Sequence, residues 1–238
     1  MESLKNKKVL IVGAGGGIGF ETARLLAGSG AYLFLAGRNI EKLNKTADAI
    51  GINESNLFAL DISSPMQIEK LKEKYFSVMS SIDILINAAG IGIIKPVETL
   101  SEEDFLKTIQ SNLYGPFLLV KAFLPFMKEA KKGLIINIPG VLGKTPMAGA
   151  AAYSASKYGL LGMMQSIREE IKRTSIRITN VFLGGVDSPF WENIDLRVQK
   201  DKMIQVEEAA KSIWFLCQQP ESGIVSELVL QPFNHQAI

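Results

Sequence analysis

Tyr153 and Lys157 are the residues whose types and spacing most directly suggest catalysis. They lie four positions apart in a segment with helical character, so on a helix their side chains share one face, one turn from each other. A phenol has a reference pKa of about 10, and a neighbouring ammonium group favours the phenolate. We therefore expect Lys157 to lower the pKa of Tyr153 towards the range in which a phenol exchanges a proton with a substrate oxygen. Taken alone, the pair is also compatible with a chance arrangement on a helix surface.

A glycine-rich segment, Gly13-Ala14-Gly15-Gly16-Gly17-Ile18-Gly19, follows a short apolar run and precedes a segment of helical spacing. Residues without side chains allow a tight turn and a close approach of a phosphate group to the backbone. The N-terminus of the following helix supplies N–H donors and a partial positive charge. We interpret the segment as a nucleotide-binding loop, with simple packing of helix on strand as the alternative. The cofactor contacts that we expect here are Gly13, Gly15, Gly17, Ile18 and Gly19.

The end of the second predicted strand indicates which dinucleotide is bound. A cofactor with a free ribose 2′-hydroxyl is usually held by an acidic residue at this point. Here Gly37 is uncharged and Arg38 follows it. A guanidinium group can form a fork of hydrogen bonds onto a 2′-phosphate, so Arg38 favours NADP(H) over NAD(H). The alternative is that Arg38 only begins the next helix.

Polar and small residues follow the third and fourth predicted strands. Ligands of open α/β sheets bind at the carboxyl ends of the strands, where these residues lie. We expect the Asp61 carboxylate to accept a hydrogen bond from an adenine amino group, and the small residues after Asn87 to let the backbone pass close to the cofactor. Taken singly, each is more often a plain turn at a strand end. The cofactor contacts expected from these two segments are Asp61, Ile62, Asn87, Ala88 and Gly90.

The elements that position these residues alternate between strand and helix along the chain. The predicted strands are continuous apolar runs, at Val9–Val12, Ala31–Ala36, Leu57–Leu60, Ile82–Ile86, Leu134–Ile138, Ile176–Phe182 and Leu228–Leu230. The predicted helices are Gly17–Ser29, Ile40–Ile50, Met66–Val78, Ser101–Ala130 with a disturbance at Gly115-Pro116, Ala150–Arg173 and Val206–Gln218. Continuous apolar strands are typical of a parallel sheet covered by helices on both faces. The pattern predicts an α/β fold with a doubly wound parallel sheet, the Rossmann type, as one domain over residues 1–238.

Composition excludes several other classes of protein. The 238 residues are 47% hydrophobic and 21% charged, which indicates a globular core. The net charge of +2 comes without a basic block, so we expect no nucleic-acid or membrane partner. One cysteine excludes an intramolecular disulfide, and a single His with no Cys cluster does not support a metal site. No signal-peptide pattern and no apolar stretch of spanning length is present, and we predict a cytoplasmic protein.

The motifs together resemble those of the short-chain dehydrogenase/reductase family over nearly the whole chain. The family's glycine pattern matches Gly13, Gly17, Ile18 and Gly19, and its Asn-Ala-Gly turn resembles Asn87-Ala88-Ala89-Gly90. Its helical Asn matches Asn112, and its Tyr-x-x-x-Lys motif matches Tyr153 and Lys157. The segment Leu183-Gly184-Gly185-Val186-Asp187-Ser188 is similar to the Pro-Gly-x-Val-x-Thr stretch that closes over the nicotinamide. The full set, in this order and at family spacing, favours a catalytic Tyr153 and Lys157 over a chance pair.

The resemblance implies a role for each matching residue. Tyr153 would be the general acid in carbonyl reduction or the base in alcohol oxidation, and Lys157 would lower its pKa and hold the nicotinamide ribose. Asn112 would position a water molecule that connects Lys157 to solvent. Gly185, Val186 and Ser188 would contact the nicotinamide. The chemistry implied is hydride transfer between nicotinamide C4 and a carbonyl carbon.

The sequence departs from the family pattern at three positions. Val12 replaces the usual Thr and Leu183 replaces the usual Pro. The most serious departure is Gly140, which occupies the position of the catalytic Ser. Loss of one hydrogen-bond donor to a substrate oxygen typically lowers the rate by ~10²–10³. Ser154 and Ser156 flank the Tyr, but their side chains point about 100° and 300° around the helix axis from it, so neither is an obvious substitute.

Two further segments suggest how the site is completed. Residues 189–206 combine large apolar and charged side chains, which is typical of a mobile substrate lid, of a surface helix or of an oligomer contact. The predicted helices Ser101–Ala130 and Ala150–Arg173 have more apolar positions than one core-facing stripe needs. In the family these two helices form a dimer contact, so the resemblance implies a homodimer or homotetramer.

We therefore predict an NADP(H)-dependent oxidoreductase that interconverts a carbonyl and an alcohol on a small, apolar substrate. The alternative is a cofactor-binding protein of the same family with weak or no catalysis, acting as a sensor or assembly partner. Gly140 is the reason to retain that alternative.

Overall fold

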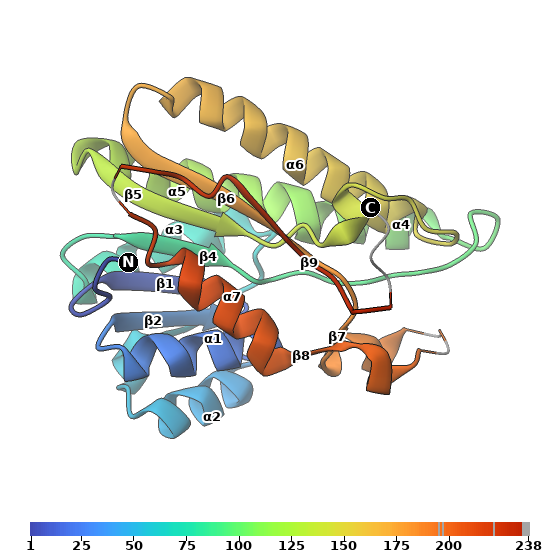
Figure 1. The fold of residues 1–238 in the computed structure, drawn as a ribbon, viewed down its shortest axis with the longest axis horizontal. Coiled ribbons are helices and arrows are strands. Elements are labelled where there is room, and N and C mark those ends of the chain that lie inside the picture. The colour runs from blue at the N-terminus through green and yellow to red at the C-terminus, as the bar shows by residue number, and fades with distance from the viewer. Residues whose placement is uncertain (195, 197, 221, 235–238) are drawn as a thin grey trace.

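The organising element is a sheet of seven parallel strands in the order β3-β2-β1-β4-β5-β6-β9 (Figure 1). The structure is a computed structural model that describes residues 1–194, 196, 198–220 and 222–234. The strands of the sheet are β1 (Lys8–Val12), β2 (Tyr32–Gly37), β3 (Leu57–Ala59), β4 (Ile84–Asn87), β5 (Lys132–Asn137), β6 (Ser175–Leu183) and β9 (Glu227–Leu230). The predicted doubly wound parallel sheet is confirmed. The strand boundaries lie within two residues of those expected, because continuous apolar runs mark strands that are buried on both faces.

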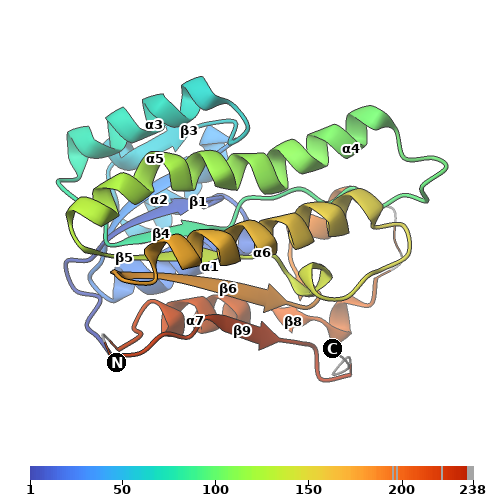
Figure 2. The same cartoon turned by 90° about the horizontal axis from the view of Figure 1, so that it is seen from above.

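Helices cover both faces of the sheet, as Figures 1 and 2 show. The helices are α1 (Gly17–Gly28), α2 (Ile40–Ile50), α3 (Pro65–Val78), α4 (Glu102–Ile109), α5 (Gly115–Glu129), α6 (Ala151–Ile171) and α7 (Val206–Leu216). Apolar residues of α3, α5 and α6 form one core with one face of the sheet, and those of α1, α2 and α7 form a second core with the other face. None of the described helices is both long enough and apolar enough to span a bilayer.

Successive residues of β1 show how the sheet divides the two cores. Leu10 packs into the core beneath α3, α5 and α6, whereas Ile11 packs into the core beneath α1, α2 and α7. Because side chains alternate across a strand, both residues must be apolar for both faces to be covered.

The long helix predicted over Ser101–Ala130 is divided in two by a turn of π-helix at Gln110–Tyr114. The sequence placed the disturbance of this helix at Gly115-Pro116, whereas in the structure it begins five residues earlier, at Gln110. Pro116 has no N–H to donate to the carbonyl of Asn112 four residues earlier, so the regular hydrogen-bond pattern cannot continue through this point. The π turn includes Asn112, whose side chain is fully buried.

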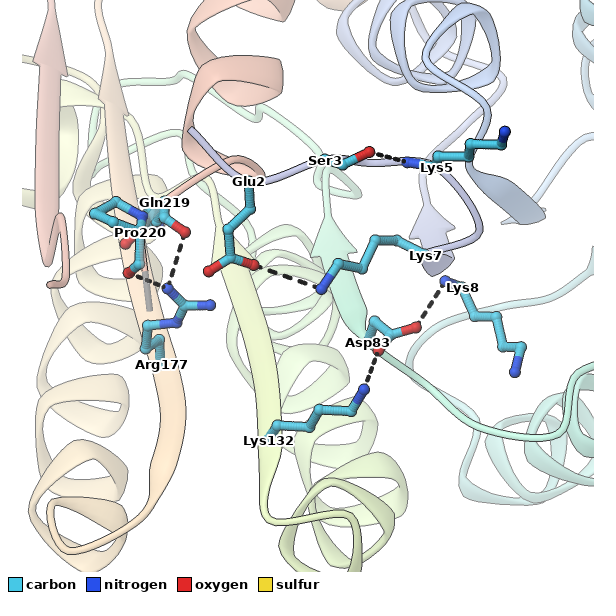
Figure 3. Close-up of polar contacts among 10 residues, drawn as sticks. All are labelled: Glu2, Ser3, Lys5, Lys7, Lys8, Asp83, Lys132, Arg177, Gln219 and Pro220. Carbon is cyan, nitrogen blue, oxygen red and sulfur yellow. Dashed lines mark hydrogen bonds and ion pairs between the residues drawn. The ribbon is translucent and has the colours of Figure 1, made fainter. Parts of the chain in front are cut away.

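The amino ends of three central strands are joined through Asp83, which immediately precedes β4 (Figure 3). One Asp83 carboxylate oxygen accepts a hydrogen bond from the Lys8 backbone N–H at 2.9 Å, and the other pairs with the Lys132 ammonium at 3.2 Å. Because Lys8 and Lys132 begin β1 and β5, this carboxylate links the strands on both sides of its own strand.

The segment that follows β6 lies at the carboxyl end of the sheet. A short parallel pair, β7 (Val186–Asp187) and β8 (Ile204–Gln205), closes the segment at its base. Between them lie two 3-10 turns, at Pro189–Asn193 and Lys200–Lys202. This is the segment predicted as a lid over 189–206, of which residues 195 and 197 lie outside the described part of the chain. Its mobility stays a prediction.

Candidate functional site

Two cavities at the carboxyl end of the sheet are each lined in part by the glycine-rich segment. The first, here called the nucleotide cavity, has a volume of about 240 Å³. It is lined by the predicted residues Gly13, Gly15, Arg38, Asp61, Ile62, Ala88 and Gly90. The loops after β1, β2, β3 and β4 therefore meet as expected for ligands at the carboxyl ends of parallel strands.

Two glycines are required by the geometry of the turn. Gly13 has φ +94°, and a Cβ built on it would lie 2.6 Å from the backbone carbon of Ala88. A Cβ on Gly19 would collide with the carbonyl oxygen of Gly13. The next helix, α1, begins at Gly17 without a side-chain cap, so no side chain competes for the N–H groups that face a bound anion. The turn thus fits a phosphate held by backbone groups.

Two cations line the nucleotide cavity beside one carboxylate. Arg38 was predicted from the sequence, but Lys42 was not. Lys42 lies in the first turn of α2, which begins at Ile40, and Arg38 lies before that helix, so helical spacing does not connect the two cations. The Asp61 carboxylate accepts hydrogen bonds from the Ser63 hydroxyl at 2.7 Å and the Ser63 N–H at 2.9 Å. Those bonds, and more weakly the Arg38 charge, hold the pKa of Asp61 below its usual value, so this carboxylate is ionised at neutral pH.

The second cavity, here called the apolar cavity, contains Tyr153. It has a volume of about 230 Å³, and its lining is mainly aliphatic and aromatic. The predicted nicotinamide contacts Gly185, Val186 and Ser188 all line it, as does Ile18 of the glycine-rich segment. Gly17 lies beside it, since a Cβ there would be 3.4 Å from the Ser188 Cβ.

Phe190 from the segment after β7 covers Tyr153. The two rings lie edge to face with centroids 5.9 Å apart. Phe190 also fills the space over Gly92, where any side chain would collide with it. Sequence patterns did not single out Gly92, because its role depends on a ring from a segment almost a hundred residues later.

Tyr153 and Lys157 lie on the same face of α6, as predicted, with the Lys157 ammonium 5.3 Å from the centroid of the phenol ring. The expectation that Lys157 lowers the pKa of Tyr153 is wrong in this structure. Burial raises the pKa of Tyr153 above its ordinary value and lowers the pKa of Lys157 to about 8. Tyr153 keeps some accessible surface because it lines the cavity, but the surrounding protein excludes enough water to outweigh the nearby ammonium. The phenol is therefore protonated at neutral pH.

Asn112 and Lys157 meet above Gly90. A Cβ on Gly90 would lie 3.3 Å from Asn112 Oδ1 and 3.5 Å from Lys157 Nζ, so a glycine leaves room for both. The Asn112 amide accepts from the Ile91 N–H and donates to the Ile91 carbonyl, each at 2.9 Å. Its Nδ2 also contacts the Ser156 hydroxyl at 3.2 Å. These bonds fix the amide beside Lys157, whose ammonium donates to the Ile138 carbonyl at 3.1 Å.

Gly140 has a backbone conformation that other residues rarely adopt. Its φ is +70° and its ψ is 170°, a region that is populated almost only by glycine. The residue lines the apolar cavity, where the family pattern places a serine hydroxyl. The missing hydroxyl thus coincides with a backbone conformation after β5 that favours glycine.

Other hydroxyl groups near Tyr153 do not replace that serine. The Ser156 hydroxyl donates to the Tyr153 carbonyl at 2.6 Å. The Ser154 hydroxyl is buried without a hydrogen-bond partner among the described residues, and Ser154 does not line the apolar cavity. Thr145 lines a third cavity, which shares Trp191 with the apolar cavity. Within the described lining of the apolar cavity, Tyr153 and Ser188 supply the hydroxyl groups.

The predicted contact Asn87 lines neither of these two cavities. Its side chain is buried at the end of β4, and Oδ1 has no hydrogen-bond partner among the described residues. It is in register with Asn137 of β5, which in turn is in register with Asn180 of β6. A row of buried amides therefore crosses the sheet below the site, a feature that no single-strand motif reveals.

The described residues also contain no cluster of His, Cys, Asp and Glu that could hold a metal ion.

Comparison with known proteins gives the same picture along the whole chain. The family described as short chain dehydrogenase matches residues 7–199. An uncharacterised oxidoreductase of Staphylococcus saprophyticus is 30% identical over 241 aligned residues, covering 98% of each protein. A metagenomic short-chain oxidoreductase solved in complex with NADP is 32% identical, with a TM-score of 0.83 and coverage of 97% of this chain and 99% of that one.

An alcohol dehydrogenase from Thermococcus sibiricus, solved with 5-hydroxy-NADP, is 26% identical. Its TM-score is 0.88, and the alignment covers 98% of this chain and all of that one. The sequence matches and the structural likeness thus agree. The chain belongs to the short-chain dehydrogenase/reductase family of oxidoreductases.

Proposed function

We propose that the protein is an NADP(H)-dependent oxidoreductase that interconverts a carbonyl and an alcohol, with Tyr153 as the catalytic acid or base. The observation that supports this most strongly is the position of the Tyr153 phenol in an apolar cavity that also contains Ile18, Val186 and Ser188. The glycine turn also approaches the nicotinamide-contact residues, since a Cβ on Gly17 would lie 3.4 Å from the Ser188 Cβ.

The nucleotide cavity supports NADP(H) over NAD(H). Arg38 and Lys42 both line it, and a 2′-phosphate would bring two negative charges to these two cations. Gly37 stands where an acidic residue would accept from a ribose 2′-hydroxyl. Two similar structures contain NADP or a derivative of it. The opposing charge is Asp61, which we propose accepts from the adenine amino group.

The bound nicotinamide supplies the hydride, and the protein supplies position and the proton. Lys157 holds the ribose, and Gly185, Val186 and Ser188 hold the ring. The phenol of Tyr153 donates a hydrogen bond, and then its proton, to the carbonyl oxygen of the substrate. Phe190 and the aliphatic walls keep bulk water from that oxygen.

The protonated phenol favours reduction at neutral pH. A neutral Tyr153 is ready to donate a proton, whereas alcohol oxidation requires the phenolate that burial disfavours. The fixed amide of Asn112 beside Lys157 places a polar group where a water molecule could return a proton to the lysine.

The alternative, cofactor binding with little catalysis, is favoured by Gly140. The missing donor predicts turnover ~10²–10³ below that of a site with a serine. Such a deficit lowers the rate without preventing the reaction, so the two hypotheses differ in whether turnover depends on Tyr153.

The test compares Tyr153→Phe with the wild type. We expect NADPH to bind both proteins with similar affinity, measured by its fluorescence. We expect turnover of a panel of ketones and aldehydes to fall by about 10²–10⁴ in the variant, because a proton donor is lost. Equal rates in both proteins, or no turnover by the wild type with NADPH bound, would count against the catalytic proposal.

The cofactor preference has a separate test. Arg38→Leu and Lys42→Met should each weaken NADPH binding by about tenfold or more, because a hydrogen bond to a charged group is lost. NADH binding should change little. If the affinities for NADPH and NADH fall equally, the two cations do not bind the 2′-phosphate.

We also propose a homodimer or homotetramer. Several apolar side chains of α5 and α6 are core residues, including Leu119, Phe123, Leu160 and Met164. Other apolar side chains along α4, the π turn, α5 and α6 are exposed: Phe105, Leu106, Tyr114, Phe117 and Tyr158. Their burial would favour pairing of these helices between copies. Sedimentation of the wild type and of Leu106→Glu tests this, with dissociation expected for the variant.

A further inference from the structure

A third cavity, here called the polar cavity, adjoins the apolar cavity that contains Tyr153. Its volume is about 470 Å³. The residues that line both cavities are Val141, Leu142, Gly184, Gly185 and Trp191. The Trp191 indole is fixed in this shared wall, because its Nε1 donates to the Val186 carbonyl at 2.8 Å. A molecule that extends past Trp191 from the catalytic side therefore enters the polar cavity.

The apolar cavity leaves limited room for the substrate. Its 230 Å³ is lined by Val186 and Ser188, which we propose contact the nicotinamide, and by Ile18. Part of that volume is therefore used by the ring, and the rest holds the reacting carbonyl and the atoms next to it. The adjoining polar cavity provides room for a longer part of the substrate.

The chemistry of the polar cavity differs from that of the apolar cavity. Thr145, Gln199, Lys202 and Gln231 supply hydroxyl, amide and ammonium donors to it. Lys202 is the only charged side chain, and no acid is present, among the described residues of its lining. A cavity with one cation, several neutral donors and no opposing acid favours a ligand with a single negative charge.

Lys200 and Lys202 differ in whether they form an ion pair within the described chain. Lys200 pairs with the Asp187 carboxylate at 3.6 Å. No ion pair within 4.0 Å is found for Lys202 in the part of the chain that the structure describes. Among the described residues, no acid therefore competes for its ammonium group with an acid from outside the chain.

We propose that the substrate bears a carboxylate, which Lys202 binds in the polar cavity while the carbonyl lies against Tyr153. The substrate class is an oxo acid, or the corresponding hydroxy acid, with an apolar segment between its two polar ends. The aliphatic walls shared by the two cavities contact that segment, and Gln199 or Gln231 donates to the second carboxylate oxygen. This assignment deepens the proposed oxidoreductase function and rests on it.

The experiment uses the full chain with NADPH and a series of straight-chain methyl-keto acids of increasing length, each paired with its methyl ester. The wild type should prefer one or more acids over the matching esters in kcat/KM. Lys202→Met should remove that preference, by about tenfold or more, because a hydrogen bond to a charged group is lost. Lys202→Arg should retain most of it. Lys200→Met, the matched control, should leave the ratio of acid to ester unchanged.

A binding measurement separates this inference from the proposed function. Calorimetry with a saturated monocarboxylate of the same length, in the presence of NADP, should detect binding to the wild type that Lys202→Met weakens. If acids and esters turn over equally and Lys202→Met changes neither, the carboxylate assignment is wrong while the oxidoreductase function stands. If nothing turns over but the monocarboxylate binds through Lys202, the site assignment stands and the reaction is wrong. No binding and no preference for acids overturns the assignment.

Discussion

Substitution of Gly140 tests whether the missing serine can be restored. The residue has φ +70° and ψ 170°, which only glycine adopts without strain. A side chain there costs about 1–3 kcal/mol of folding free energy. Steric overlap adds little, because a Cβ at Gly140 would meet the Leu183 carbonyl oxygen at 3.4 Å, an ordinary contact. We therefore expect Gly140→Ala and Gly140→Ser to lose similar stability, since the backbone and not the hydroxyl sets the cost.

The assay is denaturant unfolding of both variants, with activity measured on the same preparations. A matched control is Gly162→Ala. Gly162 lies within α6, and no atom lies within 4 Å of the Cβ that it lacks. That substitution should raise stability by about 0.5–1 kcal/mol, the usual gain of alanine over glycine inside a helix. For a chain of this size each kcal/mol corresponds to about 2–4 °C in Tm.

The serine should also fail to restore catalysis. On this backbone its side chain would start towards the Leu183 carbonyl, which is a hydrogen-bond acceptor for the new hydroxyl. A Gly140→Ser variant as stable as the wild type, or one whose turnover rises tenfold while Gly140→Ala stays unchanged, would refute this reasoning. Either result would mean that residue 140 can adopt the conformation that places a hydroxyl beside Tyr153.

Three other predictions concern charge and backbone strain. Burial lowers the pKa of Lys157 from 10.5 to about 8, so the unfolded chain binds more protons between these values and stability rises with pH there. Unfolding of cofactor-free wild type and Lys157→Met from pH 7.5 to 10 should show that rise, at most roughly 3 kcal/mol, in the wild type alone. Lys131 has φ +54°, so Lys131→Gly should stabilise the protein by about 1 kcal/mol in thermal unfolding, and a loss of stability would contradict the assigned strain. Asp83→Ala should lower the free energy of unfolding by about 1–3 kcal/mol in denaturant, because the Lys8 N–H loses its acceptor. Lys132→Met removes only an exposed partner of Asp83 and should cost under about 1 kcal/mol. Equal costs for the two variants would show that the ion pair dominates.

The local signals in the chain predicted the framework of the fold. Helix α2 was predicted at its observed bounds, Ile40–Ile50, and in the structure Asn39 caps it and Gly51 ends it in the left-handed conformation. The glycine turn and the Tyr153–Lys157 spacing were equally readable, since each depends on neighbours within one turn. The π turn around Asn112 was only partly predicted, because the sequence shows the proline but not where the helix adjusts to it.

The chemistry of the site depended on contacts that spacing does not contain. The helical period placed Lys157 beside Tyr153, but burial by distant segments reversed the expected shift of the phenol pKa. The identity of residue 140 was plain from the sequence, whereas its Gly-only conformation emerged only from the path of the chain between β5 and α6. The sequence by itself thus determined the elements, the family and which side chains are available. The tertiary structure decided their protonation, their partners and the cavities between them, because solvent exclusion and packing are set by residues far apart in the chain.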